Sequence, residues 1–447
     1  MKNTFHSYDL RGIYNDDFNK DDVYKIGFFI PQLLDTKKVV VGRDIRLSSP
    51  EIHEYLIKGI TDAGADVDDI GLATTPMVYF ATAKYGYKAG VQITASHNPA
   101  KYNGLKISKE NALPVGYDTG LNLLEKMVLT GEIIPAKIKG KVNERDIRKD
   151  YIDFQKNISI DFKNLKIGVD CSNGAVNVIL KDIWADAPLY INDVPDGNFP
   201  CHEPNPLLPE NTRQMQEFVK TNKCDIGLVF DGDADRVVFV DDKGRHVPPD
   251  LIIAVAGLYF FGEQKRQGFV IQDIRTSKSV GEFLKQFNAE TYTWKVGRAH
   301  AAPKLRELQG LFGGEYAGHY YFKDFFFSDS GILAASVILH VAGNLKKEGK
   351  KFSDLIDQIR KYENSGEINF TVNDKPAAIK RVTEYFINLE KPLKIMDFDG
   401  YRIEYADWWF NIRPSNTEPY LRLLLEAKSK DLLNEKLEII TKLINEK

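Results

Sequence analysis

Short runs of β-branched and other apolar residues recur along the chain, and each run ends in polar or glycine residues. Five examples are KKVVVGRD (37–44), GVQITASHN (90–98), LKIGVDCSNG (165–174), DIGLVFDGD (225–233) and GFVIQDI (268–274). Helix-like stretches such as residues 50–63 and 209–221 lie between them. This alternation of strand, loop and helix predicts an α/β fold with mainly parallel sheets. Ligands bind beyond the carboxyl ends of strands in such sheets, so polar motifs at those ends mark the expected active site.

Changes in composition mark the predicted domain boundaries. A polar segment, KIKGKVNERDIRKD (137–150), separates the first block from the strand near residue 165. A second change falls near Gly244. A third, at ENSGE (363–367), precedes a smaller block that ends in a charged amphipathic helix at 430–447. The predicted domains are 1–150, 151–244, 245–362 and 363–447.

Charge and composition exclude several classes of protein. A formal net charge of −3 over 447 residues argues against a broad surface for nucleic acid. The N-terminus has no apolar core typical of a signal peptide. The longest apolar stretch, residues 251–261, is shorter than the ~20 residues that span a bilayer, and it predicts a buried helix. Cys171, Cys201 and Cys224 lack metal-like spacing and are expected to be reduced thiols. We expect a cytoplasmic protein without nucleic-acid or membrane partners.

The first chemical motif is TASHNPAKYNGLKIS (94–108), in which Ser96 follows an apolar strand. A lone serine at this position would be explained as a helix cap. Here His97 and Lys106 can exchange protons or hold anions, and Gly104 lets the backbone approach a ligand. A serine that accepts a phosphoryl group splits one difficult transfer into two easier ones. The motif predicts that Ser96 is phosphorylated.

The second motif is DGDADR (231–236), with carboxylates at Asp231, Asp233 and Asp235. On a flat strand neighbouring carboxylates of this set would lie ~6.6 Å apart. That is too far to ligate one ion at ~2.1 Å. Gly232 is expected to allow a curl that gathers the three side chains.

Two other motifs fit these residues less well. An EF-hand loop needs Glu at its twelfth position, where this chain has Asp242, and a preceding helix, whereas residues 226–230 have the pattern of a strand. The haloacid-dehalogenase motif needs Thr or Val at the place of Asp235. A solvated acidic turn is the remaining alternative. Ligation by oxygen alone favours Mg²⁺, and Arg236 would balance part of the negative charge.

The third motif is GEYAGHYYF (314–322). Glu315 can accept hydrogen bonds from two sugar hydroxyls, and His319 can serve as an acid or base. Taken alone, a Glu and a His in a loop are more often ordinary surface residues. Only the presence of the other motifs favours a functional role for this one.

The fourth motif is RPSNTEPYLRL (413–423). A guanidinium fork, two hydroxyls and an amide surround a tight turn there, and they form a suitable cradle for a phosphate dianion. The residues concerned are Arg413, Ser415, Asn416 and Thr417. A capped turn that leads into a strand or helix explains this motif alone equally well.

In this order the four segments resemble the four active-site loops of the α-D-phosphohexomutase superfamily. TASHNP, DGDADR, GE-x-x-GH and RPSNTEP resemble its phosphoserine, metal, sugar and phosphate loops. YDLRG (8–12) and NFPCHEPNPLLPEN (198–211) are also similar to family segments. The S-N-T of the last loop is typical of the phosphomannomutase/phosphoglucomutase branch, whereas the glucosamine-phosphate branch has S-G-T.

The resemblance implies three related mixed α/β domains and a smaller C-terminal α+β domain around one central cleft. It implies interconversion of the 1- and 6-phosphates of glucose or mannose through phosphorylated Ser96 and a hexose 1,6-bisphosphate, which also acts as an activator. Mg²⁺ would be held by Asp231, Asp233, Asp235 and a phosphate oxygen on Ser96. Hexose phosphates would be the partners of a monomer or weak dimer.

The resemblance also implies individual roles. Lys106 and His319 would transfer protons, beside His97 in the phosphoserine loop, and Arg236 would contact the phosphoserine. The substrate would be bound by Tyr8, Arg11, Lys295, Arg298, Glu315, Arg413, Ser415, Asn416 and Thr417.

Two positions depart from the family pattern. Arg298 stands where relatives often carry histidine, and Ala317 where serine is usual. Arg298 is expected to grip a phosphate or a ring oxygen, and the preferred hexose stays open. The alternatives are an amino-sugar phosphate mutase and a catalytically idle sugar-phosphate sensor. A sensor could lose Ser96 or the aspartates, all of which are present.

Overall fold

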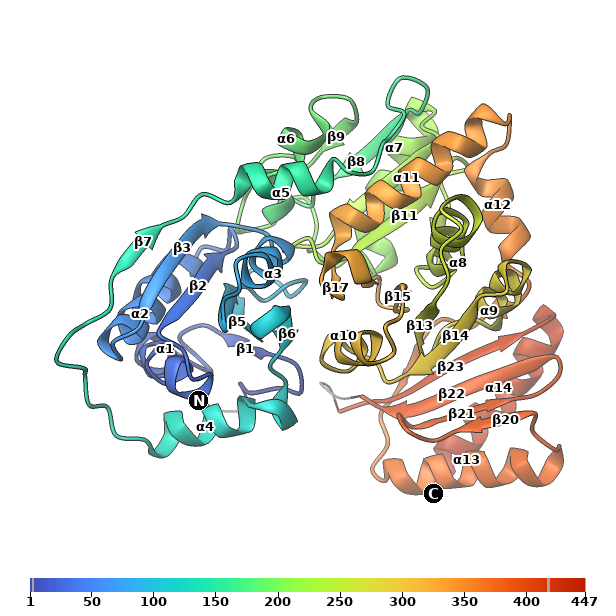
Figure 1. Ribbon diagram of the computed structural model, residues 1–447. Helices are drawn as coiled ribbons and strands as arrows, with labels where there is room; N and C mark the ends of the chain where they lie inside the picture. The colour runs from blue at the N-terminus through green and yellow to red at the C-terminus, as the bar shows by residue number, and fades with distance from the viewer. Residues whose placement is uncertain (2–3, 416–418, 447) are drawn as a thin grey trace.

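The computed structural model describes residues 1, 4–415 and 419–446, and within this part of the chain the strands form four sheets (Figure 1). The first three sheets are mixed, and the fourth is antiparallel. The predicted fold class is therefore confirmed. The predicted bias toward parallel pairing is wrong, because the first three sheets contain as many antiparallel as parallel strand pairs.

The first unit has the strand order β1-β5-β4-β2-β3-β7, with β6 paired to β5. Its strands are β1 (Leu10–Ile13), β2 (Lys38–Arg43), β3 (Asp66–Leu72), β4 (Ala89–Ile93), β5 (Tyr102–Lys109), β6 (Leu113–Pro114) and β7 (Val142–Glu144). Its helices are α1 (Lys20–Leu33), α2 (Ser49–Asp62), α3 (Thr75–Lys84) and α4 (Leu121–Thr130).

The second unit has the order β12-β11-β10-β8-β9. Its elements are α5 (Arg148–Gln155), β8 (Ile167–Asp170), α6 (Leu180–Trp184), β9 (Leu189–Ile191), α7 (Pro209–Asn222), β10 (Ile226–Phe230), β11 (Val237–Asp241) and β12 (His246–Val247).

The third unit has the order β14-β13-β15-β16-β17. Its strands are β13 (Phe269–Asp273), β14 (Glu290–Trp294), β15 (Phe312–Gly314), β16 (Tyr320–Phe322) and β17 (Ser328–Asp329). Its helices are α8 (Leu251–Gly257), α9 (Lys278–Leu284), α10 (Arg298–Glu307), α11 (Gly331–Lys347) and α12 (Phe352–Ile359).

The fourth unit has the order β18-β23-β22-β21-β20, with β19 paired to β23, and two helices. Its elements are β18 (Glu363–Asn364), β19 (Ile368–Phe370), α13 (Lys375–Leu389), β20 (Lys394–Met396), β21 (Tyr401–Glu404), β22 (Trp408–Pro414), β23 (Leu421–Ala427) and α14 (Lys430–Asn445). It lies at the lower right of Figure 1, beside β14 of the third unit.

One hairpin geometry recurs in the first three units. In each, a strand with a parallel neighbour is followed by a loop and an antiparallel partner: β4 and β5, β10 and β11, β15 and β16. The three loops are the Ser96 loop (94–101), the Asp231 loop (231–236) and the Glu315 loop (315–319). Three of the four predicted motifs therefore occupy equivalent positions, at the carboxyl ends of strands as expected.

The apolar core explains how the units are held together. One large cluster of buried side chains joins α3 of the first unit to the second and third units, from Tyr79 and Phe80 through Phe230 of β10 to Ile338 of α11. The rest of the first unit packs around a cluster of its own, which includes Val41 of β2 and Leu56 of α2. The fourth unit has a separate core that includes Phe386 of α13. Burial of apolar surface contributes roughly 25 cal/mol per Å². The shared core therefore makes one body of the first three units.

Two helices begin beside the loops of interest, and both starts follow from local sequence. Thr74 accepts a hydrogen bond from the Met77 N–H, and Pro76 occupies the first turn of α3. Ser330 caps α11 by accepting from the Leu333 N–H. Such caps satisfy N–H groups that a helix start leaves unpaired. They fix the positions of Thr75 and Asp329, which face the site.

The stretch at 251–261 is buried as predicted, although α8 ends at Gly257 and a π-helical turn, Leu258–Glu263, follows. None of the described helices combines the length and apolar composition that a bilayer crossing requires. The domain limits at 150, 244 and 362 stay predictions.

Candidate active site

The Ser96 loop turns sharply and brings its serine to the Asp231 loop. Ser96 is fully buried and has a left-handed backbone with φ of 52°. Its N–H donates to Thr94 Oγ1 at 2.8 Å, and its hydroxyl donates to Asp231 Oδ2 at 3.0 Å. For a residue other than glycine this conformation costs roughly 1–2 kcal/mol, so the surroundings must hold it in place.

Arg46 supplies that support, and no sequence motif predicted it. The side chain is 1 % exposed, and its Nε donates to Asp44 at 3.1 Å. Its Nη1 and Nη2 donate at 2.7–3.0 Å to four backbone oxygens, those of Ser96, Asn98, Pro99 and Tyr102. A rigid guanidinium fork with five donors suits this task.

The Asp231 loop gathers three carboxylates. Oxygen atoms of Asp231, Asp233 and Asp235 lie within 4.8 Å of one another, and all three side chains are fully buried. The Oδ1 atoms of Asp233 and Asp235 have no hydrogen-bond partner among the described residues. Burial and the two neighbouring charges raise the pKa of Asp231 well above its ordinary value. Unpaired, converging oxygens are the donor set that Mg²⁺ prefers, so this acidic triad fits a hard divalent ion.

Lys106 on β5 reaches into the triad. Its Nζ lies 2.7 Å from Asp233 Oδ2 and also pairs with Asp235. Although burial alone would lower it, these two carboxylates hold the pKa of Lys106 well above its ordinary value. The Thr75 hydroxyl donates to the same Asp233 oxygen at 2.5 Å.

Two glycines have roles other than the predicted ones. The residue of the Asp231 loop with a left-handed backbone is Ala234, with φ of 62°, and not Gly232. Gly232 instead permits contact between the loops, because a Cβ there would overlap the backbone oxygen of Ser96. Gly104 likewise serves strand pairing, since a Cβ there would overlap the Leu10 oxygen of β1 rather than a ligand.

His97 and Arg236 form a pair at the mouth of the triad. Arg236 Nη2 donates to His97 Nδ1 at 2.9 Å, and its Nε lies 3.6 Å from Asp231 Oδ2. Burial and the charges of Arg236 and Arg11 lower the pKa of His97 well below its ordinary value. His97 Nδ1, 3.4 Å from Ser96 Oγ, is therefore an acceptor that orients Arg236 rather than a proton donor to Ser96.

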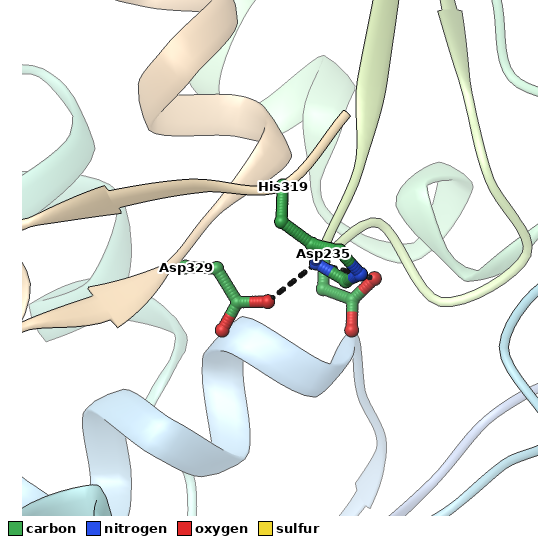
Figure 2. Close-up of side chains that lie close together, drawn as sticks. All are labelled: Asp235, His319 and Asp329. Atoms are coloured by element: carbon green, nitrogen blue, oxygen red, sulfur yellow. Dashed lines mark hydrogen bonds and ion pairs between the residues drawn. The ribbon is translucent and has the colours of Figure 1, made fainter. Parts of the chain in front are cut away.

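His319 lies opposite, at the end of the Glu315 loop. Its Nδ1 is 2.7 Å from Asp329 Oδ2 and 3.8 Å from Asp235 Oδ1, and Figure 2 shows the ring between these two carboxylates. Asp329 was not predicted, because a single aspartate before a serine cap carries no distinctive pattern. Arg298 donates through Nε to Asp329 Oδ1 at 2.9 Å and through Nη2 to the Ala112 oxygen at 2.8 Å.

A cavity of about 150 Å³ opens between these loops. The predicted residues that line it are Tyr8, Arg11, Lys106, Asp235, Arg236, Arg298, Glu315 and His319. Glu315 accepts from the Tyr321 hydroxyl at 2.5 Å and from the Gly297 N–H at 3.2 Å, and burial raises its pKa. Tyr8 donates to the Val296 oxygen at 3.0 Å across the cavity. Four cationic side chains in the lining suit an anionic ligand.

Other predicted residues lie outside this lining. Lys295 does not line the cavity, although its neighbour Val296 does. Arg413 of β22 is 3 % exposed and lies 3.9 Å from Glu367 and 3.7 Å from Asp399. Ser415 follows β22 and donates through its N–H to the Tyr420 oxygen at 2.9 Å. Asn416 and Thr417 lie outside the described residues.

A buried arginine beside Arg413 was missed. Arg275 donates to both oxygens of Asp273 and, through Nη1, to Glu367 Oε2 at 3.2 Å. The available signal was Asp273 near the end of the apolar run 268–274, because Asp231 likewise follows an apolar run at the end of β10. The third and fourth units thus meet through paired charges.

A buried serine that faces a carboxylate triad, at equivalent loops of repeated α/β units, defines an enzyme of phosphoryl transfer. Comparisons with known proteins give the family. Models of the phosphoglucomutase/phosphomannomutase family match in sequence: α/β/α domain I at residues 2–131, domain II at 149–244, domain III at 248–362 and the C-terminal domain at 367–443. The chain belongs to this family, and it is a phosphohexomutase, an isomerase.

Individual relatives agree with this assignment. A phosphomannomutase of Methanocaldococcus jannaschii is 36% identical, over 98% of this chain and 97% of its own. The crystal structure of a phosphoglucomutase/phosphomannomutase family protein from Burkholderia thailandensis is 26% identical with a TM-score of 0.89, covering 99% of this chain and 96% of that one. N-acetylphosphoglucosamine mutase of Aspergillus fumigatus, solved with GlcNAc-6P and magnesium, shares the fold at 15% identity and a TM-score of 0.57, covering 92% and 83% of the two chains.

Proposed function

We propose that this enzyme interconverts the 1- and 6-phosphates of glucose and mannose through phosphorylated Ser96 and a hexose 1,6-bisphosphate. The observation that carries the proposal is the contact between the buried Ser96 hydroxyl and Asp231 at 3.0 Å, within a triad that fits a divalent ion. The hydrogen bond from Arg46 to the Ser96 backbone oxygen supports the proposal, because it holds the serine in one position.

In the proposed transfer, a sugar hydroxyl oxygen attacks the phosphorus on Ser96. The new O–P bond forms as the bond from phosphorus to Ser96 Oγ breaks. His319 accepts the proton of the attacking hydroxyl through Nε2, and Lys106, held protonated by Asp233 and Asp235, returns a proton to Oγ. Transfer from the bisphosphate back to Ser96 uses the same groups in reverse.

The charged groups have separate tasks in this proposal. Asp231, Asp233 and Asp235 would hold Mg²⁺ beside the phosphorylated Ser96, and the bound ion would supply Lewis-acid stabilisation of the transferring oxygens. The acidic triad fits such an ion, and the Aspergillus enzyme was solved with magnesium. Arg236, oriented by its hydrogen bond to His97, neutralises charge on the phosphoserine.

The remaining contacts concern the substrate. Glu315 accepts from ring hydroxyls. Tyr8, Arg11, Lys295 and Arg298 belong to the cleft in which the sugar lies. Arg413, Ser415, Asn416 and Thr417 hold whichever phosphate is not reacting, so the bisphosphate turns end for end between transfers. A bisphosphate that dissociates leaves the serine unphosphorylated, and added hexose 1,6-bisphosphate therefore acts as an activator.

The S-N-T sequence at 415–417 supports the glucose/mannose branch over amino sugars. Loss of the serine hydroxyl at Ala317 costs about 0.5–1.5 kcal/mol per neutral hydrogen bond, which weakens both hexoses rather than choosing between them. We also propose a cytoplasmic monomer or weak dimer without nucleic-acid partners. The free thiols of Cys171, Cys201 and Cys224 are consistent with a reducing compartment.

One assay tests the substrate class. Turnover of glucose 1-phosphate, mannose 1-phosphate and glucosamine 1-phosphate is measured with a trace of the matching bisphosphate. We expect the first two to be substrates and the third to be poor. A clear preference for the amino sugar would overturn the branch, and no turnover of any would favour the idle sensor.

A further inference from the structure

The carboxylate of Asp329, behind His319, is a feature of the site that the proposed function leaves without a role. Asp329 is fully buried, and each of its oxygens has one donor. His319 Nδ1 lies 2.7 Å from Oδ2, as Figure 2 shows, and Arg298 Nε lies 2.9 Å from Oδ1. A carboxylate accepts only, so Asp329 requires a proton on both partner nitrogens. The neutral imidazole then carries its proton on Nδ1, and Nε2 has a free lone pair.

Arg298 is fixed by two further contacts. Its guanidinium carbon lies 3.7 Å from the ring centroid of Tyr79, and its Nη2 donates to the Ala112 oxygen at 2.8 Å. Tyr79 and Ala112 belong to the first unit, whereas Arg298 begins α10 of the third. The sequence suggested that Arg298 grips a phosphate or a ring oxygen. Its Nε and Nη2 are instead engaged with Asp329 and the first unit.

We propose that Asp329 is a positioning residue for His319, and that Arg298 acts one step further out by holding Asp329. The proposal rests on the proposed role of His319 as proton acceptor. In this chain the arginine that replaces the usual histidine serves proton transfer through Asp329. Its bond to Ala112 also makes this arrangement depend on contact between the first and third units. Partners that fix the tautomer of a reacting histidine are typically worth large factors in rate.

A second reading of the same residues is a metal site, because ligand atoms of Asp235, His319 and Asp329 lie within 4.8 Å of one another. The surrounding charges argue against it. Lys106 already neutralises Asp235, and Arg298 already neutralises Asp329. Arg236, whose Nε lies 3.9 Å from Asp235 Oδ1, adds a third cation. Another divalent ion would meet strong repulsion there.

The informative variant is Asp329→Asn. An asparagine has one acceptor oxygen and one NH₂ group, whereas the site presents two donors, one from His319 and one from Arg298. If the amide oxygen stays with Arg298, the NH₂ group faces His319 and favours the tautomer protonated on Nε2. The volume and shape of the side chain are nearly the same in Asp and Asn. The substitution therefore changes only which atoms donate and which accept hydrogen bonds.

The chain offers a matched control on the same helix. Arg306 donates through Nη2 to the Asn111 oxygen at 2.9 Å and to the Phe326 oxygen at 2.7 Å. It therefore joins the same two units one residue away from Ala112, but these hydrogen bonds do not involve Asp329. Arg298→Gln and Arg306→Gln both weaken the contact between units, and only the first releases Asp329.

The test combines kinetics with ¹⁵N NMR of protein labelled on histidine. The protein has eight histidines, so the His319 signals must be assigned. The His319 signals are assigned by their loss in His319→Gln. We expect the Nδ1-protonated tautomer in the wild type and its loss in Asp329→Asn. We expect kcat to fall about 10²–10³-fold in Asp329→Asn, with KM changed less than about threefold, because a misdirected proton acceptor affects the transition state most.

Arg298→Gln should lower kcat about 10–100-fold with the same change in the His319 signals, and Arg306→Gln should leave both near wild type. Equal losses in the two arginine variants, or an unchanged tautomer and kcat in Asp329→Asn, would overturn the proposal. If Asp329→Asn does not fold, the two arginine variants decide. Wild-type kcat in His319→Gln would instead refute the proton-transfer role of His319, whatever the NMR shows.

Discussion

Arg46→Lys is the substitution that most directly tests how the Ser96 loop is built. Arg46 makes five hydrogen bonds, one to Asp44 and four to backbone oxygens of the loop. Lysine has three donors, so at least two of the five bonds are lost while the positive charge is kept. Each buried acceptor left without a partner costs about 1–3 kcal/mol. We therefore expect a loss of at least about 2 kcal/mol.

Part of that loss should appear as function, because the bonds hold Ser96 in its left-handed conformation. The assay has two readouts: the free energy of unfolding of the body that contains the first unit, from urea titration, and the rate at which glucose 1,6-bisphosphate phosphorylates Ser96, from intact mass. The control is Arg148→Lys, an exposed residue paired with Asp182, which we expect to change stability by less than about 0.5 kcal/mol. Wild-type stability and phosphorylation in Arg46→Lys would refute the assignment of Arg46 as the support of this loop.

The other predictions address the reaction and its charges. Incubation with glucose 1,6-bisphosphate should add one phosphoryl mass to the wild type and none to Ser96→Ala; an unmodified wild type that still turned over would end the phosphoserine mechanism. Chelation should abolish activity and Mg²⁺ should restore it, and Asp233→Asn should lower kcat by about 10² or more without unfolding; full activity in excess chelator would contradict this. Arg413→Ala should raise KM for the 1-phosphate and the 6-phosphate alike, and a loss confined to one isomer would mean two separate phosphate pockets. Burial and the charge of Glu426 raise the pKa of Asp250 to about 7, so the folded protein keeps this proton to higher pH than the unfolded chain, whose carboxyl has a pKa near 3.8. The contribution of Asp250 to stability should therefore be present below about pH 4 and lost as pH rises to about 7, and unfolding of Asp250→Asn should lack this dependence; identical pH profiles would show that Asp250 is not protonated in the fold.

The sequence predicted those parts of the site that lie in one contiguous stretch. Ser96 with its neighbours, and the three alternate aspartates, carry their chemistry within a few positions, and each follows an apolar strand. Arg46, Asp329 and Arg275 escaped prediction because each is a single residue with at least one essential partner far along the chain. Arg46, for example, bonds to oxygens 50 or more positions away.

Which residues belong to the site was easier to predict than the contacts that those residues make. Gly232 and Gly104 were expected to provide flexibility or ligand access, yet both permit contact between segments that only the tertiary fold brings together. Arg298 was expected to bind substrate because the segment 295–300 resembles a substrate-binding loop of the family. Its partners Asp329, Ala112 and Tyr79 come from three other parts of the chain, and no local pattern announces them.

The separate core of the fourth unit bears on how long an intermediate stays bound. Between the third and fourth units, contacts such as Arg275 with Glu367 and Arg402 with the oxygens of Ile274 and Thr276 are polar, so water can hydrate the groups that separate when the two units move apart. The apolar cluster there is small, with Ile274, Val296 and Met396 as its buried members. A half-open enzyme could thus release one end of a bisphosphate while the jointly packed first three units keep the other. The polar contacts between the third and fourth units would then determine whether the bisphosphate turns end for end within the cleft or dissociates. Raising the ionic strength should lower the number of turnovers completed per bisphosphate bound.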